Sequence, residues 1–210
     1  MRNKRISIVL TAMGALLVAA ALALVAANLV DGRRAGAASS EALTKVEQEI
    51  PEAAAGEEWT LSAAGEVEIP DYILNPEAEM PVVSIDNYDY IGVLNIPSLG
   101  LSLPVMSDWS YPQLRLAPCR YKGSAYRDDM ILAAHNYDSH FGRLGQLQAG
   151  DAVTFTDVDG NLFTYAVSQL EELPGTAIEQ MDAGDWDLTL FTCTLGGRSR
   201  VTVRCTRTDK

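Results

Sequence analysis

Apolar residues follow two very different patterns along this chain. Near the N-terminus, residues 6–30 form a run of 25 residues without a charge, and a bilayer core needs about 20 apolar residues as a helix. From residue 88 onward the apolar runs are short and are separated by Gly, Pro, Asp and Asn. The pattern predicts one membrane-spanning helix followed by a domain of short strands.

Eight segments are predicted as strands because each is a short apolar or β-branched run between turn residues. Strands of this kind indicate an all-β barrel or sandwich. The sequence DVDGN at 157–161 predicts a hairpin turn through its Asp-Gly pair; an EF-hand would need Glu at the twelfth position, where Ser168 stands. Pro and Gly punctuation predicts a short helix at 174–184. The predicted strands are residues 90–96, 101–106, 113–117, 130–134, 152–156, 162–173, 187–193 and 200–206.

The formal net charge of −12 is concentrated in one segment. Residues 41–90 hold 13 acidic residues and a single basic one, Lys45. This composition predicts a solvated acidic tether, with a short helix capped by Ser39 or Ser40 and ended by Pro51. No basic stripe occurs in the sequence, so a nucleic-acid partner is not expected.

The basic residues before the apolar run set the expected orientation. Arg2, Lys4 and Arg5 favour a cytoplasmic N-terminus, although Arg33 and Arg34 weaken the asymmetry. The run is longer than a secretory h-region and favours an uncleaved anchor, while the AGA sequence that follows would suit a signal peptidase. We expect a single-pass protein of the cell membrane with its main domain outside the cell. The expected parts are a cytoplasmic tail (1–5), a transmembrane signal anchor (6–30), an acidic extracellular linker (31–87) and a catalytic domain (88–210).

Three cysteines are the candidates for chemistry. No CxxC pair or Cys/His cluster has zinc-ligand spacing, so no metal site is expected. Nucleophilic catalysis by cysteine needs a thiolate, a nearby imidazole and a group that stabilises an oxyanion. Cys193 ends a predicted strand beside a glycine-rich turn with arginines, whereas strand alternation places Cys205 in the core and leaves Cys119 ambiguous.

The two histidines differ in their predicted setting. His135 closes the strand at 130–134 and should be held rigidly, while His140 lies in a loop, where position is looser. The arginines near Cys193 could also form only a polar outer face of an edge strand; they are Arg198, Arg200 and Arg204.

The sequence TLFTC at 189–193 resembles the TLxTC signature of sortases, the cysteine transpeptidases of Gram-positive cell surfaces. A histidine closing an earlier strand (ILAAHN) and an arginine opening the next strand (SRVTV) complete the His, Cys, Arg set of that family in order. The segment IGVLNIPSLGLSLPV resembles the start of the sortase domain, and FGRLGQLQAGDAVTFTDVDGNLFTYAV resembles its middle. The resemblance covers about residues 88–207 and the N-terminal anchor.

The resemblance implies a closed eight-stranded β-barrel with short helices and no cofactor. It assigns the nucleophile to Cys193, the histidine to His135 and the arginine to Arg200, with Arg198 as the alternative. Thr192 matches a position associated with substrate contact. The sortase class stays open, because Asn136 resembles the class B pattern, yet there is no room for the long class B helix and no lid motif.

The implied activity is cleavage of an LPxTG-like sorting signal through a thioacyl intermediate. The surface protein would then pass to an amine of a peptidoglycan precursor or a pilin subunit. The alternative is a membrane-tethered, non-catalytic β-domain that binds a surface partner, with Cys119 and Cys193 joined by a disulfide.

Overall fold

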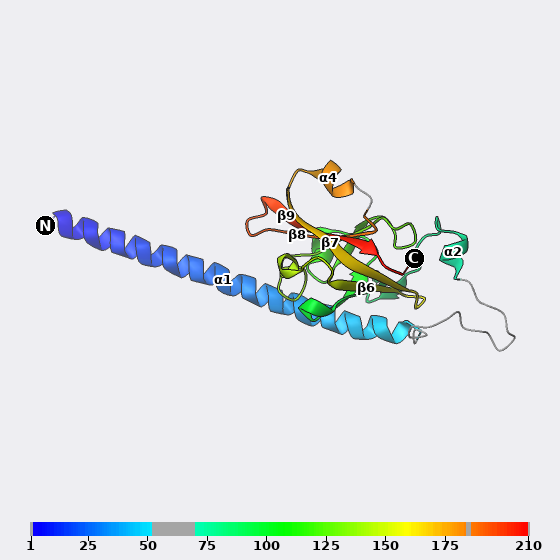
Figure 1. The fold of residues 1–210 in the computed structure, drawn as a ribbon. Coiled ribbons are helices and arrows are strands. Elements are labelled where there is room, and N and C mark those ends of the chain that lie inside the picture. The colour runs from blue at the N-terminus through cyan, green and yellow to red at the C-terminus, as the bar shows by residue number, and fades with distance from the viewer. Residues whose placement is uncertain (1, 52–69, 184–185, 210) are drawn as a thin grey trace. The chain divides into compact units, whose positions relative to one another are not determined.

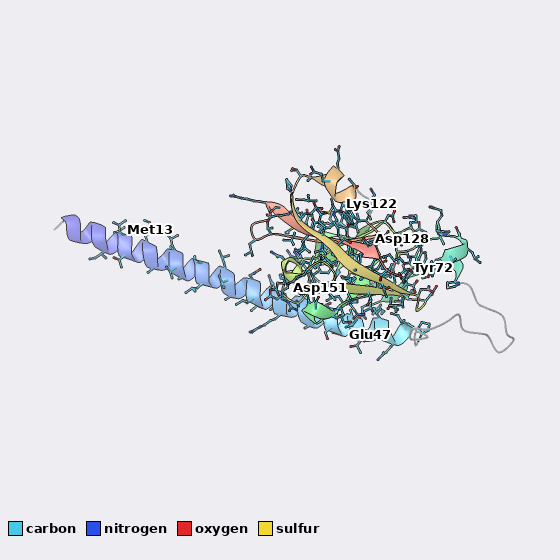
Figure 2. All side chains as sticks on the ribbon, viewed as in Figure 1. Met13, Glu47, Tyr72, Lys122, Asp128 and Asp151 are labelled. Atoms are coloured by element: carbon cyan, nitrogen blue, oxygen red, sulfur yellow. The ribbon has the colours of Figure 1, made fainter. Side chains whose placement is uncertain are left out.

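The computed structural model describes residues 2–51, 70–183 and 186–209. The chain divides into two units, the first ending at Arg34 and the second beginning at Ala35. Helix α1 runs from Arg2–Glu49 and contains an 18-residue window with a mean hydropathy of 2.7. Its apolar side chains are exposed, among them Met13 (Figure 2). By length and composition, this helix can cross a membrane.

The second unit is built around a closed β-barrel (Figure 1). The strand order is β1-β2-β3-β4-β5-β8-β9-β7-β6, and β2 also pairs with β6, which closes the sheet. The β3–β4 and β5–β8 pairs are parallel and the other pairs are antiparallel. This confirms the predicted eight-stranded barrel, with β1 as an additional strand. The strands are β1 (Val83–Ile85), β2 (Tyr88–Ile96), β3 (Leu101–Met106), β4 (Cys119–Lys122), β5 (Met130–Ala133), β6 (Ala152–Asp157), β7 (Leu162–Pro174), β8 (Leu188–Cys193) and β9 (Ser199–Arg207).

The barrel interior is filled by the inward side chains of these strands. Strand alternation sends every second residue inward, which explains why the apolar runs are short and interrupted. The largest fully buried side chains include Phe155, Phe163, Leu94, Leu132 and Leu188. Burial of such side chains stabilises the fold by roughly 1.5–3 kcal/mol each before entropy is counted.

The hairpin predicted at 157–161 is confirmed, and its physical cause is visible. The Asp157 carboxylate accepts hydrogen bonds from the backbone N–H groups of Asp159 (3.0 Å) and Asn161 (2.8 Å), while Gly160 has φ +88°. Tyr126 donates to the same carboxylate at 2.7 Å. The hydrogen bonds to the Asp157 carboxylate therefore hold the turn in this conformation.

The strand predicted at 113–117 is wrong. Short helix α3 (Tyr111–Leu114) occupies this place, with Ser110 as N-cap and Pro112 in the first turn. The strand β4 follows only after Pro118.

The helix predicted at 174–184 is reduced to α4 (Ile178–Asp182), because β7 extends to Pro174. The remaining short helices are α2 (Asp71–Leu74), η1 (Pro97–Leu99) and η2 (Leu144–Gln146).

The helix α1 occupies the start of the segment expected to be a linker. It continues unbroken past Ser39 and Ser40, which therefore cap nothing, and it ends at Glu49, before Pro51.

Val46 is fully buried in a second cluster on the outside of the barrel. This cluster also contains Tyr90, Val93, Met106, Ala117 and Cys119, with Ala42 and Leu43 packed against it. Residues 35–49 thus pack as part of the second unit because their apolar positions recur at helical spacing. The rest of the expected linker up to residue 69 lies almost wholly outside the described residues.

Candidate active site

Cys193 is the last residue of β8 and faces the outside of the barrel. Leu188 and Leu190 point into the core, so alternation turns Phe191 and Cys193 outward. All three cysteines are free, and Cys193 alone among them is partly exposed. Burial raises the pKa of the other two, Cys119 and Cys205, to about 12 each. A reactive thiolate near neutral pH is therefore excluded at those two positions.

His135 lies next to Cys193 at the end of the neighbouring parallel strand. In the β5–β8 register Ala133 pairs with Phe191. Beyond it, the Ala134 backbone N–H donates to the Phe191 carbonyl at 3.2 Å, and the Thr192 hydroxyl donates to the Ala134 carbonyl at 2.8 Å. These two hydrogen bonds therefore join the strand end that carries His135 to the strand end that carries Cys193.

Two environmental effects act on the His135 imidazole. Its burial and, to a lesser degree, the positive charge of Arg115 lower its pKa below the ordinary 6.5. Both effects disfavour the charged imidazolium. Arg115 follows α3, and nothing in its sequence context pointed to the active site.

Thr192 is buried at 3% exposure. Its hydroxyl is engaged by the Ala134 backbone. The side chain predicted to contact substrate therefore fastens the strand ends in this structure, and its substrate contact remains a prediction.

Arg200 stands directly opposite Cys193 in the β8–β9 register. Its Nη1 donates to the carbonyls of Gly197 and Ser199, both at 3.1 Å. Arg198 is exposed in the turn that precedes β9 and pairs with no β8 residue. The structure thus brings Arg200, rather than Arg198, alongside the cysteine.

Arg204 lies on the outward face of β9, as strand alternation predicted, but β9 lies between β8 and β7 and Arg204 is only 2% exposed, so the interpretation of a solvated face on an edge strand is wrong for this residue. Its Nε donates to Glu171 at 2.8 Å, and Nη1 donates to the Thr189 hydroxyl at 3.0 Å. The guanidinium also donates to the backbone carbonyls of Met181 (3.0 Å) and Gln180 (2.6 Å). Arg204 therefore ties α4 to the same outer face of the sheet that carries Cys193.

The expectation that His140 is loosely held is also wrong. Its side chain is fully buried, at 0% exposure. Burial is the main cause that lowers its pKa to about 4. Loop composition alone gave no sign of this, because the groups that cover the loop come from a distant part of the chain.

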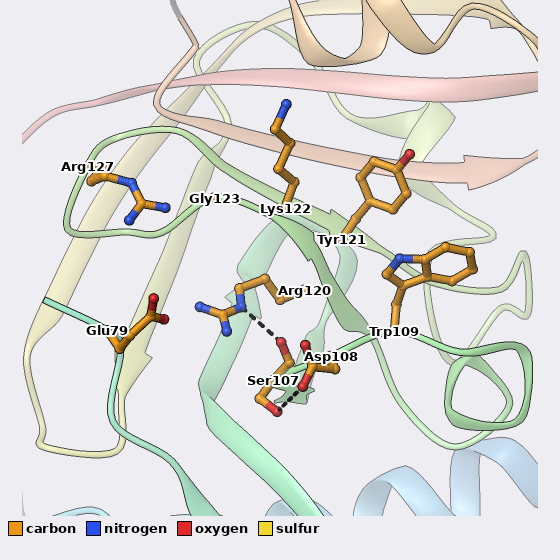
Figure 3. Close-up of a pocket in the computed structure, with 9 residues that line it drawn as sticks. All are labelled: Glu79, Ser107, Asp108, Trp109, Arg120, Tyr121, Lys122, Gly123 and Arg127. Atoms are coloured by element: carbon orange, nitrogen blue, oxygen red, sulfur yellow. Dashed lines mark hydrogen bonds between the residues drawn. The ribbon is translucent and has the colours of Figure 1, made fainter. Parts of the chain in front are cut away.

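A row of aromatic rings leads from the site toward a pocket. Phe191 meets Tyr121 edge-on, with ring centroids 5.5 Å apart, and Tyr121 lies 5.6 Å from Trp109. Beyond these rings lies a pocket of about 400 Å³ (Figure 3). Its lining includes Ser107, Trp109, Arg120, Tyr121, Arg127 and Glu79.

Three cations line this pocket, and Arg120 differs from Lys122 and Arg127 in its pairing. Its Nε donates to the Ser107 carbonyl at 2.9 Å, which fixes the plane of the guanidinium (Figure 3). Lys122 is paired with Asp182 at 2.8 Å, and Arg127 lies 3.5 Å from Asp129. Within the described part of the chain, Arg120 makes no ion pair. No cluster of metal-ligating side chains occurs among those residues either.

Comparison with known proteins gives a consistent result. A family model described as the sortase domain matches residues 94–208. Sortase D of Bacillus subtilis (strain 168) is 27% identical over 177 residues, covering 82% of this chain and 86% of its own length. Sortase A of Bacillus anthracis is 29% identical over 136 residues, covering 62% of each.

Solved structures share the same fold. Sortase C1 from Streptococcus suis has 25% identity and a TM-score of 0.50, covering 58% of this chain and 74% of that one. A Sortase D5 transpeptidase from Clostridium perfringens has 17% identity and a TM-score of 0.52, covering 66% and 87%. The second unit therefore has the barrel architecture of these proteins.

Proposed function

Since this chain belongs to the sortase family, we propose that it is a cysteine transpeptidase that joins surface proteins bearing an LPxTG-like sorting signal to an amine. The observation that carries the proposal is the placement of one partly exposed thiol, Cys193, between His135 at the adjoining strand end and Arg200 across the hairpin. Cys193 and Cys119 are both free, which weighs against the disulfide expected for the non-catalytic alternative.

The reaction proceeds by two acyl transfers. The Cys193 thiolate attacks the threonyl carbonyl carbon of the sorting signal, and the carbonyl electrons move onto oxygen. The C–N bond then breaks, the departing amine takes a proton from the His135 imidazolium, and a thioester remains. An acceptor amine attacks that thioester, its proton passes to His135, and the thiolate leaves. Two such steps replace one difficult amide exchange.

The surroundings of His135 limit how much enzyme is ready to react. Burial and Arg115 lower the pKa of His135, so an isolated imidazolium is a minor species at neutral pH. A thiolate at Cys193 supplies the negative charge that favours the protonated ring. The reactive thiolate–imidazolium pair therefore forms as a unit.

Arg200 is the proposed donor to the substrate oxyanion or the sorting motif. Its Nη1 is already held by the Gly197 and Ser199 carbonyls, which fixes the guanidinium at the turn that follows Cys193. The planar fork retains further N–H groups for a substrate carbonyl. A donor fixed before the reaction stabilises developing charge without reorganisation.

We propose that the substrate polypeptide extends from Cys193 over Phe191 and Tyr121 toward the pocket at Arg120. Aromatic side chains and arginine are the residue types enriched at peptide-recognition sites. The two Nη groups of Arg120 suit a carboxylate, while Glu79 and Asp108 on the same lining disfavour a highly anionic peptide. This pocket would read residues that flank the motif.

The proposed function also implies a cellular location and a set of partners. The apolar part of α1 would hold the enzyme in the cell membrane, with the catalytic unit outside the cell. Its partners would be surface proteins with a C-terminal sorting signal and an amine of a peptidoglycan precursor or pilin subunit.

The test is a transpeptidation assay on the full-length chain in detergent. A library of LPxTG-like peptides is incubated with a small amine such as triglycine, and products are identified by mass spectrometry. We expect a ligated product that disappears in Cys193→Ala. Product formation by Cys193→Ala, or no product from any peptide with folded enzyme, would contradict the proposal.

A further inference from the structure

The loop that follows His135 is fixed by its own backbone. The Tyr137 carbonyl accepts hydrogen bonds from the N–H groups of His140 and Gly142, both at 2.9 Å, and the Phe141 N–H donates to the His135 carbonyl at 3.2 Å. A Cβ added at Gly142 would lie 2.6 Å from a loop carbonyl oxygen. The loop backbone therefore packs so tightly around Gly142 that no side chain fits at this position.

Three rings connect the catalytic histidine to the interior of this loop. The Tyr137 ring lies 5.1 Å from the His135 ring and 5.7 Å from the His140 ring, centroid to centroid. Neither nitrogen of His140 makes a side-chain hydrogen bond of good geometry with the described residues. Packing therefore holds His140 in place, together with the Ala35 backbone, which acts on the ring as a weak hydrogen-bond partner.

The cover comes from α1, within the same unit of the chain. Ala35 and Ser39, one helical turn apart, are 4% and 3% exposed. A Cβ added at Gly36 would lie 3.0 Å from the Cβ of Ser139, the residue before His140. The Ala35 backbone is also close enough to His140 to influence its pKa. This turn of α1 therefore rests directly on the histidine loop.

We propose that residues 35–39 hold this loop closed and that Tyr137 and His140 are positioning residues, which orient the His135 ring through direct ring packing. The proposal rests on the proposed function only for the proton-transfer role of His135.

The first test uses two valine substitutions in the full-length chain. Gly36→Val places a branched side chain where there is no space, whereas Gly14→Val meets no heavy atom within 4 Å. Both replace a glycine inside a helix, so the change in helix propensity is matched. The readouts are the pH dependence of Cys193 alkylation by iodoacetamide, which needs no substrate, and single-turnover acylation by the best sorting peptide.

We expect Gly36→Val to expose His135 to water, to move its titration limb upward toward 6.5 and to slow acylation roughly tenfold, since small displacements of a catalytic group are costly. Gly14→Val should match the wild type. Near-UV circular dichroism checks folding, and Gly36→Ala, which adds one methyl group at the same place, replaces the valine variant if that variant unfolds. If the Gly36 and Gly14 variants show the same pH dependence of Cys193 alkylation and the same acylation rate, the proposed role of the helix is wrong.

The second test leaves the helix untouched. Tyr137→Phe keeps the ring and should behave as wild type, while Tyr137→Ala removes it and should lower kcat roughly tenfold with little change in KM. If Tyr137→Ala keeps both kcat and the titration limb, the positioning role is wrong. If the limb moves as expected but no peptide acylates the wild type, the positioning holds and the proposed function fails.

Discussion

Lowering the pH from 7 to 5 should destabilise the wild-type chain more than a His140→Phe variant. Burial and the nearby His135 lower the pKa of His140 from 6.5 to about 4. The unfolded chain takes up this proton near pH 6.5, while the folded chain resists it down to about pH 4. Stability is therefore lost as the pH falls through that window. Between pH 7 and pH 5 the loss from this one group is roughly 2 kcal/mol.

The assay is urea denaturation of the full-length chain in detergent, followed by tryptophan fluorescence. The carboxylates titrate in both proteins, so their contributions cancel, and the remaining difference reports the titration of His140 together with its coupling to His135. The phenyl ring introduced by His140→Phe would fill nearly the same space without a titrating group, which is why this variant is the control. A pH dependence equal in wild type and variant would refute the claim that the buried imidazole is neutral in the fold.

Three further predictions concern the arginines and the catalytic histidine. Arg204→Gln removes the ion pair to Glu171 and the donors that hold α4, and we expect about 2–3 kcal/mol less free energy of unfolding in urea; an unchanged midpoint would rule out the anchoring role. His135→Ala and Arg200→Ala should each slow single-turnover acylation at least about 100-fold, with poor rescue by Arg200→Lys and little effect of Arg198→Ala; the reverse order of the two arginines would contradict the register argument. Arg120→Gln should raise KM about tenfold for peptides with an acidic residue outside the motif and leave neutral peptides unchanged, and an equal effect on both sets would argue against a carboxylate site.

The alternation of apolar and polar residues was enough to predict the features that depend on which face of a strand a residue occupies. The period of two separated Cys205, which lies in the core, from the outward positions of β9. It also identified Cys193 as a strand-end thiol. Seven of the eight predicted strands correspond to observed strands for the same reason. The hairpin at 157–161 followed from turn chemistry that acts over a few residues.

The remaining features depend on contacts between distant segments, which alternation does not report. Arg204 sits at an outward position, yet α4 covers that face and buries it. His140 is covered by a turn of α1 that lies far earlier in the chain. The acidic composition of the expected linker likewise concealed a stripe with Val46 at its centre that packs on the barrel. At 113–117, the N-cap Ser110 and a proline outweighed the alternating apolar residues.

The central claim is that Cys193 carries the acyl group, and intact mass spectrometry of the enzyme tests it most directly. The full-length chain is mixed with the best sorting peptide without an acceptor amine and quenched in acid, and the adduct is located by proteolysis. The account predicts one thioester adduct on Cys193, lost in Cys193→Ala and retained in Cys119→Ala and Cys205→Ala. An adduct on another residue, or one that survives in Cys193→Ala, would contradict it.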